Sequence, residues 1–285
     1  MRLCAIVPSY NHTAAIGGVV GHLRAAGLPV FVIDDGSDAA AAMALQALGE
    51  PQVVVHRLAV NQGKGGAVMA GFQLATAAGF THALQVDADG QHDLAALPRL
   101  LAAARQHPGA LIAGRPVFDA SLPLGRRLGR WITHVWVWIE TLSTRISDSM
   151  CGFRIYPLAA VAQVLAGARP GRRMDFDPEI MVRLAWAGTE VVEVPVAVAY
   201  PPGNTSNFRL WDDNLRISWM HTRLALGMLL RLPAILANRS RGRLHWSELS
   251  ERGGIHGLRL VAAAYRLLGR PLCVAILVPV VAFFF

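Results

Sequence analysis

The sequence predicts an α/β domain with a mainly parallel sheet flanked by helices. Short apolar runs alternate with segments of helical periodicity through residues 3–113, and this alternation predicts parallel strands joined by crossover helices. Polar and acidic clusters stand directly after several of the apolar runs. Because ligands bind at the carboxyl ends of strands in such sheets, these clusters are the first candidates for a functional site.

Each predicted strand is an apolar run of four or five residues, at 3–7, 30–33, 53–57, 82–86 and 110–113. Pro8 ends the first run, since proline cannot donate a backbone hydrogen bond. The intervening segments predict helices at 14–26, 39–48, 66–78 and 94–106, with Thr13 as a candidate N-cap of the first.

The second half of the chain is less regular. Residues 131–142 include three tryptophans, which fits a core helix and fits equally an amphipathic helix at a membrane interface. The strand pattern fades after Glu193-Val194-Pro195. Residues 212–232 predict a further helix that ends at Pro233.

Charge is concentrated toward the C-terminal end. The net charge is +8, and residues 203–270 hold eleven arginines against four acidic residues. Basic residues beside apolar stretches indicate an anionic membrane surface or a phosphate-bearing lipid as partner. We expect no nucleic-acid partner, because this region lacks the aromatic stacking pattern and the zinc-ligand spacing of common nucleic-acid modules.

The three cysteines are far apart and form no paired motif, which favours a reducing, cytosolic setting over a disulfide framework or a structural zinc site. Residues 271–285 carry no charge and are fewer than the roughly 20 residues that span a bilayer. We expect a membrane-embedded or interfacial end, or a hydrophobic helix cut short from a longer protein.

Three polar segments that follow or flank predicted strands could hold a nucleotide. Segment 8–11 (Pro-Ser-Tyr-Asn) could hold a flat base, and segment 34–38 (Asp-Asp-Gly-Ser-Asp) could accept hydrogen bonds from a base or ribose. Each could equally be a polar turn. Segment 61–66 (Asn-Gln-Gly-Lys-Gly-Gly) opens a helix with glycines that let backbone N–H groups approach an anion, and it contains the chain's single lysine, Lys64.

Segment 86–92 (Val-Asp-Ala-Asp-Gly-Gln-His) carries the strongest signal. It places two carboxylates, Asp87 and Asp89, directly after a strand, and hard divalent cations such as Mg²⁺ take oxygen ligands of this kind. An EF-hand loop is the competing interpretation. It is disfavoured because Pro98 stands where the twelfth-position glutamate would be.

Together these segments resemble a family 2 glycosyltransferase of the dolichyl-phosphate mannosyltransferase type, which has the GT-A fold. The resemblance covers roughly residues 1–225, and it rests on segments 8–11, 34–37, 61–65, 87–92, 114–115, 148–154, 176–179 and 193–195. It departs from the family pattern at His12, where the family usually has glutamate, and this leaves the donor open between a GDP-linked and a UDP-linked sugar.

The resemblance implies roles for individual residues. Base and ribose contacts fall to Pro8, Tyr10, Asn11 and Asp35, and donor binding extends to Lys64. A Mg²⁺ or Mn²⁺ ion would be held by Asp87, Asp89 and Gln91. Arg115 and Arg126 would face the phosphates of donor or acceptor, and Arg154, after a Cys-Gly-Phe strand, would help to position them. The implied catalytic residues are Asp89, Arg115 and Asp148, the last as the base for a hydroxyl acceptor.

The implied function is inverting transfer of a sugar from a nucleotide sugar to a membrane lipid acceptor, either a polyprenyl phosphate or a glycolipid intermediate, at the cytoplasmic face of the inner membrane. Transfer would be non-processive, because the Gln-x-x-Arg-Trp motif of processive synthases is incomplete: Arg127 stands at the glutamine position before Arg130-Trp131. A sugar nucleotidyltransferase and a non-catalytic, nucleotide-sugar-binding membrane adaptor remain as alternatives.

The C-terminal region has its own resemblance. Residues 245–270 resemble the N-terminal start of lipid A-type lauroyl acyltransferases. We therefore expect a glycosyltransferase domain at 1–225, followed by a basic, membrane-associated helical tail, amphipathic or hydrophobic, at 226–285.

Overall fold

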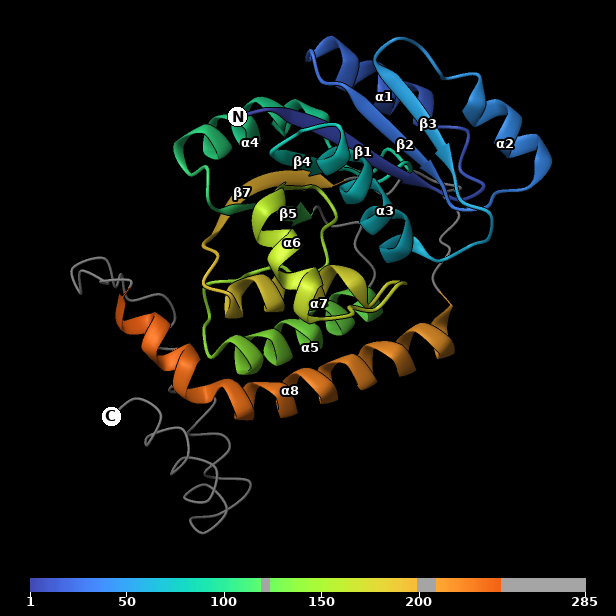
Figure 1. The fold of residues 1–285 in the computed structure, drawn as a ribbon. Helices are drawn as coiled ribbons and strands as arrows, with labels where there is room; N and C mark the ends of the chain where they lie inside the picture. Colours follow the sequence, from blue (N-terminus) through green and yellow to red (C-terminus); the bar gives the residue numbers. More distant parts are fainter. Residues whose placement is uncertain (119–123, 199–208, 242–285) are drawn as a thin grey trace. The chain divides into compact units, whose positions relative to one another are not determined.

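The computed structural model describes residues 1–118, 124–198 and 209–241, and the chain divides into two units, Met1–Leu236 and Ala237–Phe285. The first unit contains a seven-stranded sheet of order β3-β2-β1-β4-β6-β5-β7 (Figure 1). Its strands are β1 (Leu3–Ser9), β2 (Val30–Asp34), β3 (Val53–Arg57), β4 (His82–Gln85), β5 (Leu111–Phe118), β6 (Arg154–Pro157) and β7 (Val191–Val198). The predicted α/β class and the mainly parallel sheet are confirmed.

Six of these strands run in one direction, and β6 runs against its neighbours β4 and β5. The reversal has a consequence for function. Arg154, the first residue of β6, pairs with Gln85, the last residue of β4. The loop that enters β6 therefore reaches the edge of the sheet where the parallel strands end.

Helices cover both faces of the sheet. They are α1 (Ile16–Ala25), α2 (Ala39–Gln46), α3 (Lys64–Ala77), the 3₁₀ turn η1 (Leu94–Ala96), α4 (Leu97–Gln106), α5 (Leu124–Thr141), α6 (Leu158–Gly167), α7 (Phe176–Trp186) and α8 (Leu210–Arg241). Side chains of α1, α2 and α4 share one core with the sheet, and those of α3, α5, α6, α7 and α8 share the other. Neighbouring residues of β1 alternate between the two cores, as the pleat of a doubly covered strand requires.

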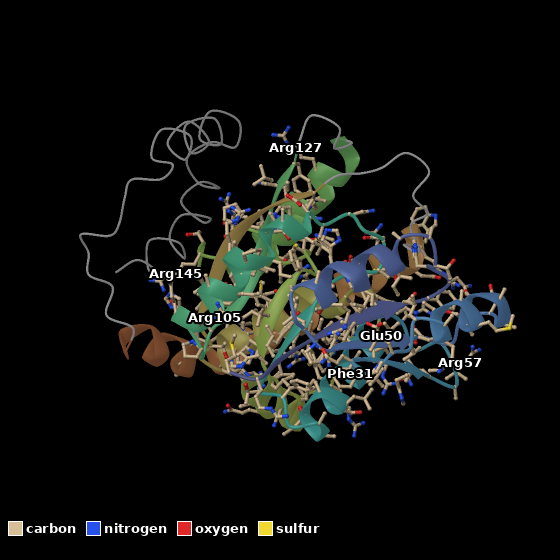
Figure 2. All side chains as sticks on the ribbon, turned by 90° about the horizontal axis from the view of Figure 1, so that it is seen from above. Phe31, Glu50, Arg57, Arg105, Arg127 and Arg145 are labelled. Carbon is tan, nitrogen blue, oxygen red and sulfur yellow. The ribbon has the colours of Figure 1, made fainter. Side chains whose placement is uncertain are left out.

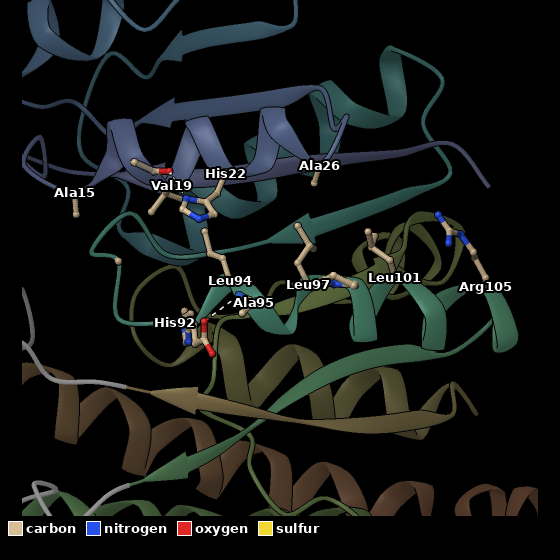
Figure 3. Close-up of a pocket in the computed structure, with 14 residues that line it drawn as sticks. Ala15, Val19, His22, Ala26, His92, Leu94, Ala95, Leu97, Leu101 and Arg105 are labelled. Carbon is tan, nitrogen blue, oxygen red and sulfur yellow. Dashed lines mark hydrogen bonds between the residues drawn. The ribbon is translucent and has the colours of Figure 1, made fainter.

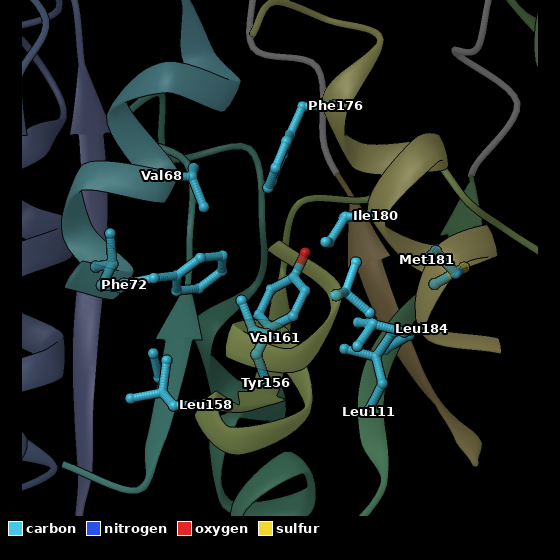
Figure 4. Packing of buried hydrophobic residues seen from close by; sticks show 14 of the residues in the cluster. Val68, Phe72, Leu111, Tyr156, Leu158, Val161, Phe176, Ile180, Met181 and Leu184 are labelled. Atoms are coloured by element: carbon cyan, nitrogen blue, oxygen red, sulfur yellow. The ribbon is translucent and has the colours of Figure 1, made fainter. Parts of the chain in front are cut away.

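The core under α3, α6 and α7 is rich in aromatic side chains (Figure 4). Phe72 of α3 meets Tyr156 of β6 edge to face, with ring centroids 5.0 Å apart. Phe31 of β2, labelled in Figure 2, meets Phe80 in the same way at 5.9 Å. Such pairs add about 0.5–1.5 kcal/mol to the burial of the rings.

Several predicted boundaries differ from the structure. Strand β1 continues through Pro8 to Ser9; its pairing with β4 ends at Ile6, so the missing N–H of Pro8 leaves no gap in the ladder. Helix α1 begins after Ala15, so Thr13 is not its N-cap. Helix α3 begins at Lys64, two residues earlier than expected.

The prediction that a helix ends at Pro233 is wrong, because α8 continues to Arg241 with this proline inside it. Proline removes one helical hydrogen bond, and in α8 the helix continues on both sides of it. The boundary expected between 225 and 226 therefore falls within a helix. The resemblance of residues 245–270 concerns residues outside the described part. In the described ranges, no helix combines the length and the apolar character needed to cross a membrane.

Candidate active site

The polar segments that follow β1, β2 and β4 meet at one edge of the sheet. Ser9 at the end of β1 pairs with Asp34 at the end of β2, and Ile6 pairs with Gln85 at the end of β4. Asn11 has a positive φ of 54°, and its backbone N–H donates to Ser37 Oγ at 2.9 Å. This is the carboxyl edge of the parallel strands, where the sequence predicts the site.

The Asp35 carboxylate holds the backbone of residues 61–66, which we call the glycine loop. Its carboxylate oxygens accept hydrogen bonds from the backbone N–H groups of Gln62 at 2.7 Å and Gly63 at 2.8 Å, and the residue is only 2% exposed. Burial raises the pKa of Asp35 above its usual value, against the effect of these hydrogen bonds. In this structure Asp35 organises the backbone that begins α3, a role not evident from the sequence.

Asp87, the first carboxylate after β4, lies between the side chains of Lys64 and His92. Lys64 Nζ lies 2.8 Å from Oδ1 and 3.0 Å from Oδ2, and only the second contact has hydrogen-bond geometry. His92 Nε2 lies 3.5 Å from Oδ2. Burial would raise the pKa of Asp87, but Lys64 and His92 outweigh it and hold that pKa well below its usual range. Asp87 is therefore ionised at neutral pH.

Lys64 is held by a second carboxylate that the sequence did not suggest for this role. Asp177 Oδ2 of α7 lies 2.8 Å from Lys64 Nζ, and Gln85 Nε2 donates to the other Asp177 oxygen at 3.0 Å. Burial would lower the pKa of Lys64, but Asp177 and Asp87 reverse this and raise it. Segment 176–179 belongs to the family resemblance, but only the fold brings it against the glycine loop.

The Asp87 and Asp89 pair fits a divalent cation. Asp87 Oδ1 is buried, and its close contact within the described residues is the 2.8 Å ion pair with Lys64 Nζ. Burial and the nearby charge of Asp87 raise the pKa of Asp89, and a cation would relieve this repulsion. Asp89 Oδ1 accepts from the backbone N–H of Gln91 at 3.0 Å. Within the described residues no cluster of three histidine, cysteine or acidic side chains is placed to hold a metal.

Gly152 lets the loop before β6 approach this pair. A Cβ at Gly152 would lie 2.8 Å from both Asp87 Oδ2 and Lys64 Nζ. A Cβ there would displace the ends of the Asp87 and Lys64 side chains, so glycine lets this loop lie close to both. The loop before β6 thus closes one side of the site.

Asp148, the expected base, lies against the side chains of Arg130 and His134. One oxygen accepts from Arg130 at 2.5 Å and lies 3.4 Å from His134, and the other accepts from the backbone of Met150 and Cys151. Burial would raise the pKa of Asp148, but His134 and Arg130 hold it well below its usual range. A carboxylate so stabilised is a poor proton acceptor, which argues against the base role.

Arg154 also differs from its expected position. It begins β6 rather than following a strand, and its side chain is fully buried. Its Nη1 donates to the Asp177 carbonyl at 2.7 Å and its Nη2 to the Ser149 carbonyl at 2.6 Å. In this conformation Arg154 supports the loops around the site and offers no exposed donor to a phosphate.

The remaining candidates lie near the same edge. Tyr10 is 38% exposed beyond β1, whereas Pro8 is buried within the strand. Arg115 is exposed on β5, two residues beyond Ala113, which pairs with Arg154 of β6. The side chain of Arg126 lies outside the described residues.

A groove of about 840 Å³ lies between α1 and α4 (Figure 3). Its walls are mainly apolar and include Val19, Leu94, Leu97 and Leu101, while neither Asp87 nor Asp89 lines it. Gly90 and His92 line it where it borders the site. The groove is therefore a neighbour of the carboxylate pair and not the site itself.

Comparison with known proteins identifies the family of the chain. A family profile described as glycosyl transferase family 2 matches residues 4–161. An undecaprenyl-phosphate mannosyltransferase of Micrococcus luteus is 31% identical over 69% of this chain and 83% of its own length. A polyprenol monophosphomannose synthase of Mycolicibacterium smegmatis is 29% identical over 68% of this chain and 76% of its own length.

Solved structures share the fold at low sequence identity. Glucosyl-3-phosphoglycerate synthase of Mycobacterium tuberculosis, crystallised with Mn²⁺ and UDP-glucose, superimposes with a TM-score of 0.56 at 16% identity, covering 81% of this chain and 78% of that one. Mannosyl-3-phosphoglycerate synthase of Rubrobacter xylanophilus gives 0.55 at 16%, covering 86% and 76%. By the extent of the profile match and the likeness to its relatives, the chain belongs to glycosyl transferase family 2 and is a glycosyltransferase.

Proposed function

We propose that the protein transfers one sugar, with inversion, from a GDP- or UDP-linked donor to a polyprenyl phosphate at the cytoplasmic face of the cell membrane. The observation that carries this proposal is the partly buried carboxylate pair Asp87 and Asp89 at the carboxyl edge of the sheet, beside the glycine loop. The two relatives named for undecaprenyl phosphate and polyprenol support a lipid phosphate over a glycolipid as acceptor.

The cofactor in this proposal is Mn²⁺ or Mg²⁺, held by Asp87, Asp89 and the Gln91 side chain. The M. tuberculosis neighbour with Mn²⁺ and UDP-glucose supports this choice. When bound, such an ion supplies positive charge that offsets the negative charge of a leaving nucleoside diphosphate.

The chain's own residues bind and orient the donor. Asp35 fixes the backbone at the N-terminus of α3 by accepting from the N–H groups of Gln62 and Gly63, and the Gly66 N–H donates to the Arg172 carbonyl. These N–H groups are therefore occupied by the protein, and the donor is held by side chains. The Lys64 ammonium adds a full charge beside the carboxylates. Tyr10 and Asn11 border the same edge and contact the base, and Arg115 faces a phosphate of donor or acceptor.

No residue needs to act as a base in this proposal. A phosphate acceptor is ionised at neutral pH and attacks without losing a proton. Asp148 then serves to hold Arg130 and the loop before β6. Its depressed pKa suits that role, since the charge persists across the working pH range.

The experiment measures transfer of labelled mannose or glucose from GDP-mannose or UDP-glucose to detergent-solubilised undecaprenyl phosphate with Mn²⁺. We expect Asp89→Asn to lower the rate about 100-fold or more, because it removes one charge from the cation site. Asp93→Asn is the matched control in the same segment, because Asp93 is exposed and caps η1. It should keep nearly full activity.

Two results would contradict the proposal. One is pyrophosphate release from a nucleoside triphosphate and a sugar phosphate without any lipid product, which would identify a nucleotidyltransferase. The other is donor binding by calorimetry with no transfer to any polyprenyl phosphate, which would identify an adaptor.

A further inference from the structure

The outward faces of α5 and α8 are apolar where solvent-facing helices are normally polar. Ten of the sixteen large hydrophobic side chains exposed among the described residues lie on these two helices. They include Trp131 (57% exposed) and Ile132 on α5, and Trp211 (80%), Leu215 (68%) and Trp219 (62%) on α8. The other six, such as Met43 on α2, are scattered over separate elements.

Helix α8 is apolar along two opposite stripes. Ile217, Met220 and Leu224 are buried in the core shared with α7. Trp211, Leu215 and Trp219 recur every fourth residue on the other side. A helix that only covered a core would carry one apolar stripe and a polar outer face. The second stripe therefore has no partner within the described residues.

Helices α5 and α8 pack against each other. Trp136 of α5, 40% exposed, stacks on His221 of α8 with ring centroids 6.0 Å apart. His221 Nδ1 lies 2.8 Å from Glu140 Oε1 of α5, which fixes the helices side by side. Figure 1 shows α8 along the outer side of the layer that contains α5 and α7. We call the exposed apolar residues of α5 and α8 the α5–α8 face.

Charge around this face is positive. Arg127 of α5, Arg216 of α8 and Arg209 just before α8 are exposed, and among the described side chains of the two helices Asp212, which pairs with Arg209, is the exposed acid. A second copy of this chain would bring a like charge against the face. An anionic bilayer attracts it, and tryptophan is the residue favoured at the interface between headgroups and acyl chains.

The face also borders the catalytic edge. Arg130 of α5 binds Asp148 and lies over the Phe118 ring at the end of β5, 4.9 Å from its centroid. The N-terminal half of α5 therefore lies beside the loop that closes the site.

We propose that the α5–α8 face docks the protein on an anionic membrane, with both helices lying in the plane of the interface. This brings the carboxyl edge of the sheet to the level of lipid headgroups, where the phosphate of a polyprenyl acceptor lies. The proposal deepens the proposed function, on which only the choice of acceptor rests.

The test labels single positions of the full chain with an environment-sensitive fluorophore. Leu215→Cys reports on the face, and Met43→Cys, at 72% exposed against 68% for Leu215, reports on α2. Both carry Cys273→Ser, while Cys4 and Cys151 are buried. With phosphatidylglycerol vesicles we expect a blue-shifted, brighter signal at position 215 and none at 43, and 0.5 M salt should weaken it.

A second measurement uses sedimentation with the same vesicles. The double variant Trp211→Gln and Trp219→Gln should need about tenfold more lipid for half-binding, because it withdraws two aromatic side chains from the interface. Met43→Gln should bind as the unaltered protein does. Sugar transfer to detergent-solubilised acceptor should be unchanged in both, since neither touches the site.

Three outcomes overturn the proposal. If the protein sediments with vesicles but the fluorescence of the label at position 215 does not shift, another segment binds the membrane. A blue shift without vesicles that grows with protein concentration shows a second copy on the face, and one that does not grow shows coverage by the chain itself. Because the vesicle assays contain no sugar donor, failure of docking and failure of transfer are separate results.

Discussion

Asp148 illustrates how a buried carboxylate is stabilised at the scale of one residue. Its two oxygens meet Arg130, His134 and two backbone N–H groups, and its pKa is held well below the ordinary value. A group whose folded pKa is depressed contributes stability above its unfolded pKa, about 3.9 for aspartate, and loses it as pH falls through the folded value. The contribution is therefore fully present at neutral pH.

We expect Asp148→Asn to lower the free energy of unfolding by about 2–4 kcal/mol at pH 7, because Arg130 and His134 lose their buried counter-ion. The difference from the unaltered protein should shrink below pH 4. Urea unfolding at pH 7 and pH 3 measures both values. Asp212→Asn is the control, since this side chain is 62% exposed and its 3.9 Å pair with Arg209 contributes under about 1 kcal/mol. An equal cost at both pH values would refute the assignment.

At the scale of one element, α3 depends on glycine for its approach to the sheet. A Cβ at Gly71 would lie 2.4 Å from Cγ2 of Ile6, which is fully buried on β1 and stiff because it is β-branched. The first turn is equally tight, since a Cβ at Gly65 would lie 2.4 Å from Cβ of Phe176. Close packing here keeps Lys64 within reach of Asp87 and Asp177.

We expect Gly71→Ala to destabilise the protein by about 1–3 kcal/mol through overpacking, although alanine favours a helix. Gly21→Ala in α1 is the matched control, because nothing lies within 4 Å of a Cβ there. It should stabilise by about 0.5–1 kcal/mol through helix propensity alone. Chemical denaturation of the two variants gives the sign of each change in the free energy of unfolding. A stabilising Gly71→Ala would show that α3 can shift away from β1.

For the whole molecule, the proposed cation and donor couple to folding. A nucleoside diphosphate that binds only the folded state at about 100 times its Kd stabilises it by about 2.7 kcal/mol. For a domain of this size we expect Tm to rise by roughly 5–10 °C with Mn²⁺ and the matching nucleotide. Differential scanning calorimetry with GDP and UDP identifies the base. A shift of the same size in EDTA would show that the nucleotide binds without the metal.

Much of the candidate site follows from local sequence. The alternation of apolar runs and helices predicts the parallel strands, and parallel strands bring the residues after β1, β2 and β4 to one edge. Asp87 and Asp89 could therefore be predicted to lie beside segments 34–38 and 61–66. Hydrophobic periodicity is a property of residues close together in the chain, so it can be recognised without knowledge of distant contacts.

The tertiary structure decided those features of the site that depend on contacts between residues far apart in the chain. The reversal of β6 puts Arg154 opposite Gln85 and buries it, and no local pattern distinguishes this arginine from an exposed phosphate ligand. Asp177 reaches Lys64 because α7 packs against α3. The α5–α8 face exists because packing buries one stripe of each helix and leaves the other exposed. The sequence by itself determined the strands and the carboxylates that end them, whereas partner choice and burial depend on contacts between residues far apart in the chain.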